Sequence, residues 1–251
     1  MKAAIRAQFN RQAACYLRGS GMDDPEVLDR MVALACPADR ALDVACGAGF
    51  LALALARDAG RVAGIDLSEK MLAEAERLRA EQKARNVTFL PGDAEHLPFG
   101  DERFQVVACK LAFHYFQNPD RALAEMRRVL APSGRLVLVD RVASENPDRR
   151  AWHIRIERAR TPAKLRLYAP AEVAGLIVKA GFQVVARQAW TQRMSFEEWV
   201  QRTGASEERV RCARELLVAS MPGDRAGLDP RWEGERLTFS MPEFLVVALL
   251  R

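Results

Sequence analysis

Cysteine, histidine and long apolar runs are scarce in this sequence of 251 residues. The five cysteines are scattered, with no CxxC pair and no His/Cys cluster at metal-ligand spacing, so neither a disulfide framework nor a metal site is predicted. Residues 244–250 form one of the longest apolar runs, far shorter than the roughly 20 residues that span a bilayer. The N-terminus has no apolar block of signal-peptide length, so we expect a cytoplasmic protein without a membrane span.

The sequence also has only a small surplus of positive charge. The 38 basic and 33 acidic side chains give a net charge of +5, which is too small by itself to indicate nucleic-acid binding. Hydrophobic residues make up 49% of the chain and charged residues 28%, a composition typical of a globular protein.

Short apolar strands alternate with helical segments through the first 140 residues. Strands are predicted at residues 41–45, 62–66, 87–90, 104–109, 135–140, 182–186 and 243–250. Helices are predicted to start at Asp23-Asp24-Pro25, after Ser68 and after Asn118-Pro119, and to cover 50–59, with Gly60 as the C-terminal glycine, and 171–180. Pro132-Ser133-Gly134 is a predicted turn. This alternation indicates a doubly wound α/β sheet, Rossmann-like, with mostly parallel strands.

We interpret the chain as one domain over residues 1–251. An N-terminal helical cap covers 1–39 and a ligand-binding core covers 40–140. Two segments, 141–170 and 195–238, interrupt the alternation and are interpreted as helical insertions. Ligands of such folds bind outside the carboxyl ends of the strands, so we expect the insertions to cover a site there.

Three motifs follow three consecutive predicted strands. Gly47-x-Gly49 allows the backbone to approach a ligand closely at the first turn. Asp66 lies nineteen residues after Gly47 and suits a ribose diol. Gly92-Asp93-Ala94 ends the third strand, where Asp93 suits an adenine amine. Each motif alone also fits an ordinary turn or helix start, but together they point to one nucleoside site at the sheet edge.

These motifs resemble those of class I S-adenosylmethionine-dependent methyltransferases. The matching segments are LDVACGAG, IDLSEKML, GDAEHLPFGDERFQVVACKLAFHYFQNP and RVLAPSGRLVLVD, within residues 5–140. The resemblance extends to the small-molecule branch that includes ubiquinone and menaquinone biosynthesis C-methyltransferases. It implies a seven-stranded sheet whose last strand runs antiparallel, with S-adenosylmethionine as the cofactor.

The resemblance also implies roles for individual residues. Ala45, Gly47 and Gly49 would face the methionine part of the cofactor, with Lys110 beside it, and Asp66 would bind the ribose. The remaining implied contacts are Leu67 and Met71 on the adenine, Asp93 and Ala94 at its edge, Leu111 and His114 on the path to the acceptor, and Phe9 and Tyr16 closing over the cofactor. Ala45 departs from the family, because many relatives have glycine there.

A dinucleotide oxidoreductase is the main alternative, because Gly47-x-Gly49-x-x-Ala52 also fits its fingerprint. The carboxylate of Asp43 would repel a pyrophosphate at this turn but suits the ammonium and sulfonium of S-adenosylmethionine. An RNA methyltransferase and a non-catalytic binding protein stay open as further alternatives. We expect methyl transfer by in-line displacement to a small molecule, with carbon, oxygen and nitrogen acceptors all open.

A general base is required only if the acceptor arrives protonated, and the chain has three histidines with which to supply one. His114, after the fourth strand, is the candidate base or substrate contact, and a structural histidine in the aromatic run 113–116 is the alternative. His96 is interpreted as a loop residue, and the role of His153 stays open. Asp140 ends the fifth strand and could face the acceptor, although a turn or cap role is favoured.

Segment 141–170 contains eight basic and three acidic residues, a surplus equal to that of the whole chain. One interpretation is an anionic acceptor held by arginine. Contact with RNA or an anionic membrane surface is a second, and RNA is disfavoured because no RNA-binding module is visible. A solvated amphipathic helix is the favoured interpretation.

Overall fold

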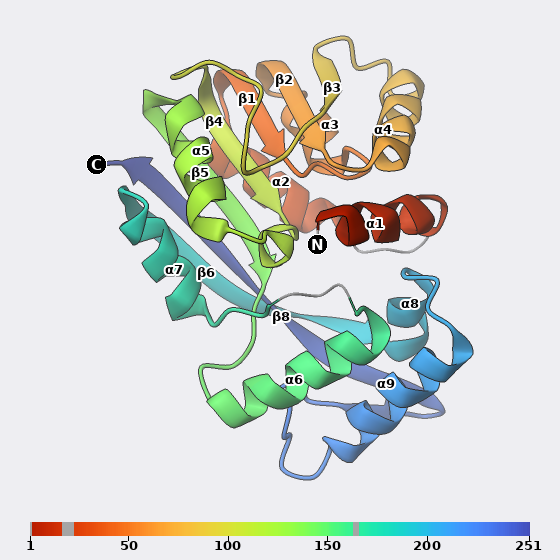
Figure 1. The fold of residues 1–251 in the computed structure, drawn as a ribbon. Coiled ribbons are helices and arrows are strands. Elements are labelled where there is room, and N and C mark those ends of the chain that lie inside the picture. Colours follow the sequence, from red (N-terminus) through yellow and green to blue (C-terminus); the bar gives the residue numbers. More distant parts are fainter. Residues whose placement is uncertain (1, 17–22, 163–165) are drawn as a thin grey trace.

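A twisted sheet with helices on both faces organises the chain (Figure 1). The computed structural model describes residues 2–16, 23–162 and 166–251, without the side chains of 14–16. The strands of that part are β1 (Ala38–Val44), β2 (Ala59–Asp66), β3 (Val87–Pro91), β4 (Phe104–Lys110), β5 (Leu130–Arg141), β6 (Phe182–Ser195), β7 (Arg231–Glu233) and β8 (Arg236–Leu250). The helices are α1 (Lys2–Tyr16), α2 (Pro25–Ala35), α3 (Phe50–Leu55), α4 (Glu69–Glu81), α5 (Pro119–Val129), α6 (Pro147–Arg160), α7 (Pro170–Lys179), α8 (Phe196–Gln201), α9 (Glu207–Ala219) and the 3-10 helix η1 (Phe113–Tyr115).

The strand order is β3-β2-β1-β4-β5-β8-β6. Strands β1 to β5 pair in parallel, whereas β8 runs antiparallel to both β5 and β6. This order confirms the predicted Rossmann-like sheet with an antiparallel last strand. The short β7 is an addition to the seven predicted strands and pairs with the first residues of β8.

Alternating side chains of the buried strands supply the two hydrophobic cores. In β5, Leu136 and Leu138 belong to one core, together with residues of α5 and α7. Val137 and Val139 belong to the other core, together with residues of α2, α3 and α4. Because successive side chains of a strand point to opposite faces, a continuous apolar run serves two helical layers.

Predicted helix starts agree with the structure where a polar side chain caps the backbone. Asp24 accepts from the backbone N–H groups of Glu26 and Val27 at the start of α2. Ser68 accepts from Met71 N at 3.2 Å in α4, and Asn118 accepts from Arg121 N in α5. These caps satisfy N–H groups that have no partner inside the helix.

Two local predictions were wrong. Helix α3 ends at Leu55, and Gly60 lies inside β2, where an added Cβ would lie 2.8 Å from the carbonyl oxygen of Asp39. The glycine is therefore needed for close strand packing and does not end the helix. Pro132 to Gly134 lie within β5, where the pairing shifts from Phe104–Leu130 to Val106–Arg135.

A third, smaller core lies outside the sheet proper. Strands β6 and β8 continue as a long ribbon beyond β5, and α6, α8 and α9 pack at its end (Figure 1). Trp199, Phe196 and Phe239 are fully buried there, together with Leu217 of α9. We call this part the cap; its segments fall in the predicted insertions 141–170 and 195–238, although β6 and β8 reach further into it than predicted.

Within the described ranges, no helix has the length and apolar character that a membrane crossing requires.

The cap core should contribute to global stability. Leu217→Ala removes a fully buried side chain, which typically costs about 2–5 kcal/mol, and should lower the midpoint of thermal unfolding. Glu215→Ala, on the exposed side of the same helix, should leave the midpoint almost unchanged. Circular dichroism melts of both variants would check this, and equal midpoints would show that the cap core unfolds separately.

Candidate functional site

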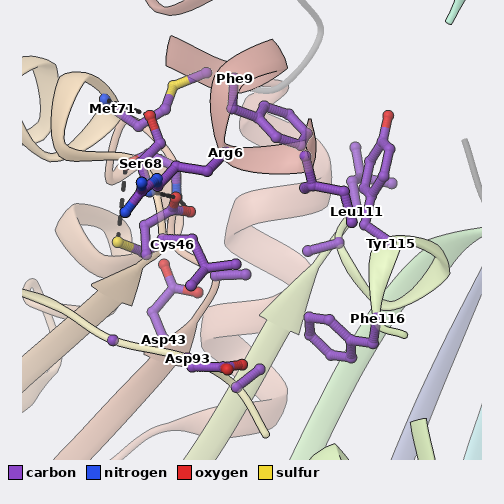
Figure 2. Close-up of a pocket in the computed structure, with 18 of the residues that line it drawn as sticks. Arg6, Phe9, Asp43, Cys46, Ser68, Met71, Asp93, Leu111, Tyr115 and Phe116 are labelled. Carbon is purple, nitrogen blue, oxygen red and sulfur yellow. Dashed lines mark hydrogen bonds between the residues drawn. The ribbon is translucent and has the colours of Figure 1, made fainter. Parts of the chain in front are cut away.

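A pocket opens at the carboxyl ends of β1, β2 and β4, with α1 lying over it. Figure 2 shows the carboxylates of Asp43 and Asp93 on one side of it and the rings of Phe9 and Tyr115 on the other. Of the predicted cofactor residues, the pocket is lined by Phe9, Asp43, Ala45, Gly47, Asp66, Leu67, Met71, Asp93, Ala94, Lys110 and Leu111. The three motifs therefore meet at one place.

The glycine turn has a left-handed backbone at three positions. Ala45, Gly47 and Gly49 have φ values of 59°, 54° and 83°. A Cβ at Gly49 would lie 2.6 Å from the ring of Phe89, so this glycine supports the pocket from behind and does not line it. Ala45 adopts a conformation that favours glycine, so an alanine here carries some backbone strain.

Asp66 joins the first two turns through both of its carboxylate oxygens. Gly47 N donates to Oδ2 at 2.9 Å, and Ser68 N donates to Oδ1 at 2.8 Å. Burial raises the pKa of Asp66, and the N–H groups of Ser68 and Gly47 offset part of that rise. Each oxygen keeps a further lone pair, so the carboxylate can also accept from a ligand diol.

Asp43 is the clearest sign that the pocket has a cationic ligand. It is 1% exposed, and its Oδ2 atom has no hydrogen-bond partner among the described residues. Burial raises its pKa to about 7, with the nearby carboxylate of Asp66 adding to the rise and Lys110 opposing it. A buried carboxylate oxygen without a donor is costly unless a ligand supplies one. An ammonium group, such as that of the methionine part of S-adenosylmethionine, fits this position.

Asp93 is held by a residue that the sequence analysis did not single out. Lys2 of α1 donates to Asp93 Oδ2 at 2.7 Å and also pairs with Glu95 Oε2 at 2.6 Å. Burial would raise the pKa of Asp93, but the Lys2 ammonium and the Glu95 N–H hold it below the usual value. No motif of the sequence marks Lys2, because its role depends on where α1 packs.

Helix α1 is fastened over the pocket by contacts along its length. Asn10 Oδ1 accepts from Ser68 Oγ at 2.7 Å, and the ring of Phe9 meets that of Tyr115 edge-on with centroids 5.0 Å apart. Phe9 thus lines the pocket from the α1 side. Tyr16 is the last residue of α1, and its side chain lies outside the described part of the structure.

Lys110 and Leu111 form the inner end of the pocket, at the end of β4. Lys110 is 8% exposed, and burial lowers its pKa to about 8, with Glu243 opposing this shift. Leu111 adopts a left-handed backbone with φ of 55°, which turns the chain into η1.

His114 follows Lys110 and Leu111 and lies in η1, but it is not among the residues that line the pocket. It is 3% exposed, its Nδ1 lies 2.6 Å from Asp140 Oδ1, and its backbone N donates to Asp140 Oδ2 at 2.8 Å. A carboxylate only accepts, so Nδ1 carries the proton and Nε2 is the basic nitrogen. Asp140 is therefore a partner of the His114 ring, and it also accepts from the backbone N–H groups of His114 and Arg141, which agrees with the turn or cap role favoured for it. His96 lies in the loop after β3 as predicted, and His153 is fully buried in α6.

Comparison with known proteins agrees with this geometry. The family model for a methyltransferase domain matches residues 42–138. An uncharacterized methyltransferase of Bacillus subtilis, YcgJ, is 30% identical over 203 residues, which is 80% of each protein. A demethylmenaquinone methyltransferase of Thermus thermophilus is 45% identical over 103 residues, covering 40% of this chain and 46% of that protein.

Solved structures extend the likeness to the cap. The crystal structure of the YcgJ protein has a TM-score of 0.83 at 28% identity and covers 90% of this chain and 99% of that one. A putative methyltransferase of Bacillus halodurans also has a TM-score of 0.83 at 28% identity, covering 89% and 98%. With the nucleoside motifs at one sheet edge and this likeness, the chain belongs to the S-adenosylmethionine-dependent methyltransferases of the class I fold.

Proposed function

We propose that this chain transfers the methyl group of S-adenosylmethionine to a small-molecule acceptor by in-line displacement. The observation that supports it most is the buried Asp43 carboxylate oxygen without a donor, facing a pocket built from three consecutive strand ends. The likeness to demethylmenaquinone methyltransferases supports a small acceptor, because the name of those relatives states a small molecule.

In this proposal the residues mainly bind and orient. When bound, the cofactor supplies a methyl group on a sulfonium, which is already activated. Asp66 accepts from the ribose hydroxyls, Asp93 and Ala94 hold the adenine edge, and Asp43 pairs with the ammonium. Phe9 and Tyr115 exclude water from the inner end. Positioning of this kind can contribute up to roughly 7–11 kcal/mol to lowering a barrier.

His114 is proposed as the base for an acceptor that arrives protonated. Asp140 fixes the imidazole so that Nε2 is free of the proton, and it stabilises the cation that forms when Nε2 takes one. Because His114 does not line the cofactor pocket, the acceptor would approach from the cap side of η1.

Asp66→Ala should weaken binding of S-adenosylhomocysteine by about 2–3 kcal/mol, because two charge-assisted hydrogen bonds to the ribose are lost. Glu69→Ala, an exposed carboxylate at the start of α4, is the matched control and should bind like the unmodified protein. Isothermal titration calorimetry measures both. Unchanged affinity in Asp66→Ala would remove this residue from the site.

Affinity for S-adenosylhomocysteine should depend on pH with a maximum between about 7 and 8. Asp43 binds an ammonium only when ionised, and its pKa is raised to about 7, so affinity falls as the pH drops below that value. Lys110, with a pKa lowered to about 8, loses its charge above that pH and no longer attracts the ligand carboxylate. Asp43→Asn should remove the acid limb only. A flat profile in the unmodified protein contradicts both assignments.

His114→Gln should lower the rate of methyl transfer to a hydroxyl or amine acceptor by about 10²–10⁴-fold while leaving affinity for S-adenosylhomocysteine unchanged. The measurement is incorporation of radiolabelled methyl from S-adenosylmethionine into a panel of phenols, amines, quinols and carboxylates. Asp140→Asn should show a smaller loss that moves the pH profile. Full activity in His114→Gln would make this histidine structural.

A further inference from the structure

A second hollow, which we call the α6–α7 groove, is open to solvent and lies between α6 and α7 (Figure 1). Side chains four residues apart on one face of α6 form one wall: Arg150, Ile154 and Arg158. One face of α7 forms the other wall: Glu172, Gly175, Leu176 and Lys179. The chain between the two helices contributes residues 166–168. None of these described lining residues belongs to the cofactor pocket.

The base of the α6–α7 groove is apolar. Leu167 is 3% exposed, and Ile154 and Leu176 are half-buried, so these three side chains offer apolar surface to a ligand. Tyr168 is buried and packs its ring on Phe113 of η1, with the ring centroids 5.5 Å apart. Because that ring is engaged inside the protein, it is not a platform on which a nucleic-acid base could stack.

Positive charge predominates along the walls of the groove. Among the described lining residues, Arg150, Arg158, Arg166 and Lys179 are cations, and Glu172 is the one carboxylate. That carboxylate already accepts from Arg150 at 2.5 Å. The lining residues therefore carry more positive than negative charge, which favours an anionic ligand.

The cations are spread along the groove and are not gathered at one point. Arg150 and Arg158 are eight residues apart on α6, which is about 12 Å along the helix axis. Lys179 stands on the other wall, where it pairs with Asp120 at 3.0 Å. Those two side chains are 70% and 52% exposed, and a pair so exposed contributes little. An elongated ligand with several negative charges can contact more of these cations than a single small anion can.

Gly175 is a second, independent sign of a ligand. It is exposed in the middle of α7, where glycine weakens a helix relative to alanine. A Cβ built on it would meet no described atom within 4 Å. Its backbone is also not left-handed, so neither packing among the described residues nor conformation requires a glycine here. A glycine on the wall of a groove lets another backbone approach the helix closely.

We propose that the α6–α7 groove docks an acidic amphipathic helix of a partner protein. The apolar stripe of that helix packs on Ile154, Leu167 and Leu176, and its backbone passes over Gly175. Its carboxylates pair with the cations of the two walls. An RNA strand fits the apolar base poorly, and a flat lipid surface does not enter a groove between two helices. Docking at this place is a property beyond methyl transfer.

The test uses the full chain and a labelled synthetic helix with leucine at i, i+3, i+4 and i+7, glutamate on both flanks and alanine elsewhere. Two further peptides replace every glutamate by glutamine or by lysine. Fluorescence anisotropy gives the affinities at about 0.15 M salt, with and without saturating S-adenosylhomocysteine. We expect the acidic helix to bind with a Kd on the order of 10–100 μM, about 10-fold more tightly than the glutamine helix. The lysine helix should bind more weakly than both.

Gly175→Leu should lower the affinity for the acidic helix about 10-fold or more, because the new side chain occupies the wall of the groove. The same change should raise the Tm by about 1–4 °C, since leucine favours a helix and the position is open. Ala171→Leu, at an exposed position of α7 outside the groove, is the matched control and should bind like the unmodified protein. A fall in Tm in Gly175→Leu would show that the glycine serves the packing of the free chain, against the proposal.

Replacing Arg158 and Lys179 together by glutamine should lower the affinity for the acidic helix about 10-fold and leave the affinity for the glutamine helix unchanged. The matched control replaces Arg149 and Arg155, two exposed cations of α6 outside the groove, in the same way. Because both double variants lose the same net charge, a difference between them reports the groove itself. Equal losses in the two would contradict the proposal.

The proposal fails if the three peptides bind equally, or if the acidic helix does not bind at concentrations up to about 1 mM. It also fails if Gly175→Leu leaves acidic-helix binding intact, because the peptide would then bind elsewhere. Poly(A) RNA or phosphatidylglycerol vesicles that bind where the acidic helix does not would assign the groove to those ligands. A dimer of the unmodified protein that Gly175→Leu dissociates would assign it to a second copy. Failure to bind S-adenosylhomocysteine would contradict the proposed function alone, since the two sites share none of the described lining residues.

Discussion

The site depends on the two hydrogen bonds that the Asp66 carboxylate accepts from the backbone. Asp66 stands at the end of β2 and accepts from Gly47 N in the preceding turn and from Ser68 N at the start of α4. One side chain thereby fixes the distance between two chain reversals that lie nineteen residues apart in sequence. Because Asp66 also lines the pocket, the residue that orders the turns lies where the ligand binds.

Three carboxylates gather on the nucleoside side of the site. Asp43, Asp66 and Asp93 line the pocket there, and Lys110 is the cation at its inner end. A cationic donor would meet charges of opposite sign at these carboxylates, which favours its binding in one orientation. Transfer removes the positive charge from the donor, so the acidic side then holds the product less strongly.

The sequence predicted the parts of the fold that are determined locally. The caps at Asp24, Ser68 and Asn118 satisfy their own helix ends, and the buried strands show as apolar runs, so both were visible. Gly60 was misassigned because a glycine after a helical run has the same pattern whether it ends the helix or packs against a neighbouring strand. Lys2 was missed because its ion pair with Asp93, 91 residues away, depends on tertiary packing.

In the basic segment 141–170, composition does not predict which charged side chains are buried, whereas helical periodicity does. Counted together, its cations resemble a solvated face, and Arg149 and Arg155 are indeed exposed. The buried residues of α6 are His153, Ile156, Glu157 and Arg160, which follow the i, i+3, i+4, i+7 spacing of an inward helix face. Charged side chains on that face cannot be there for solubility, because each costs free energy to bury. Glu157 and Arg160 on that stripe pair with each other at 3.2 Å, so position along the helix, rather than the number of cations, separates buried charges from solvated ones.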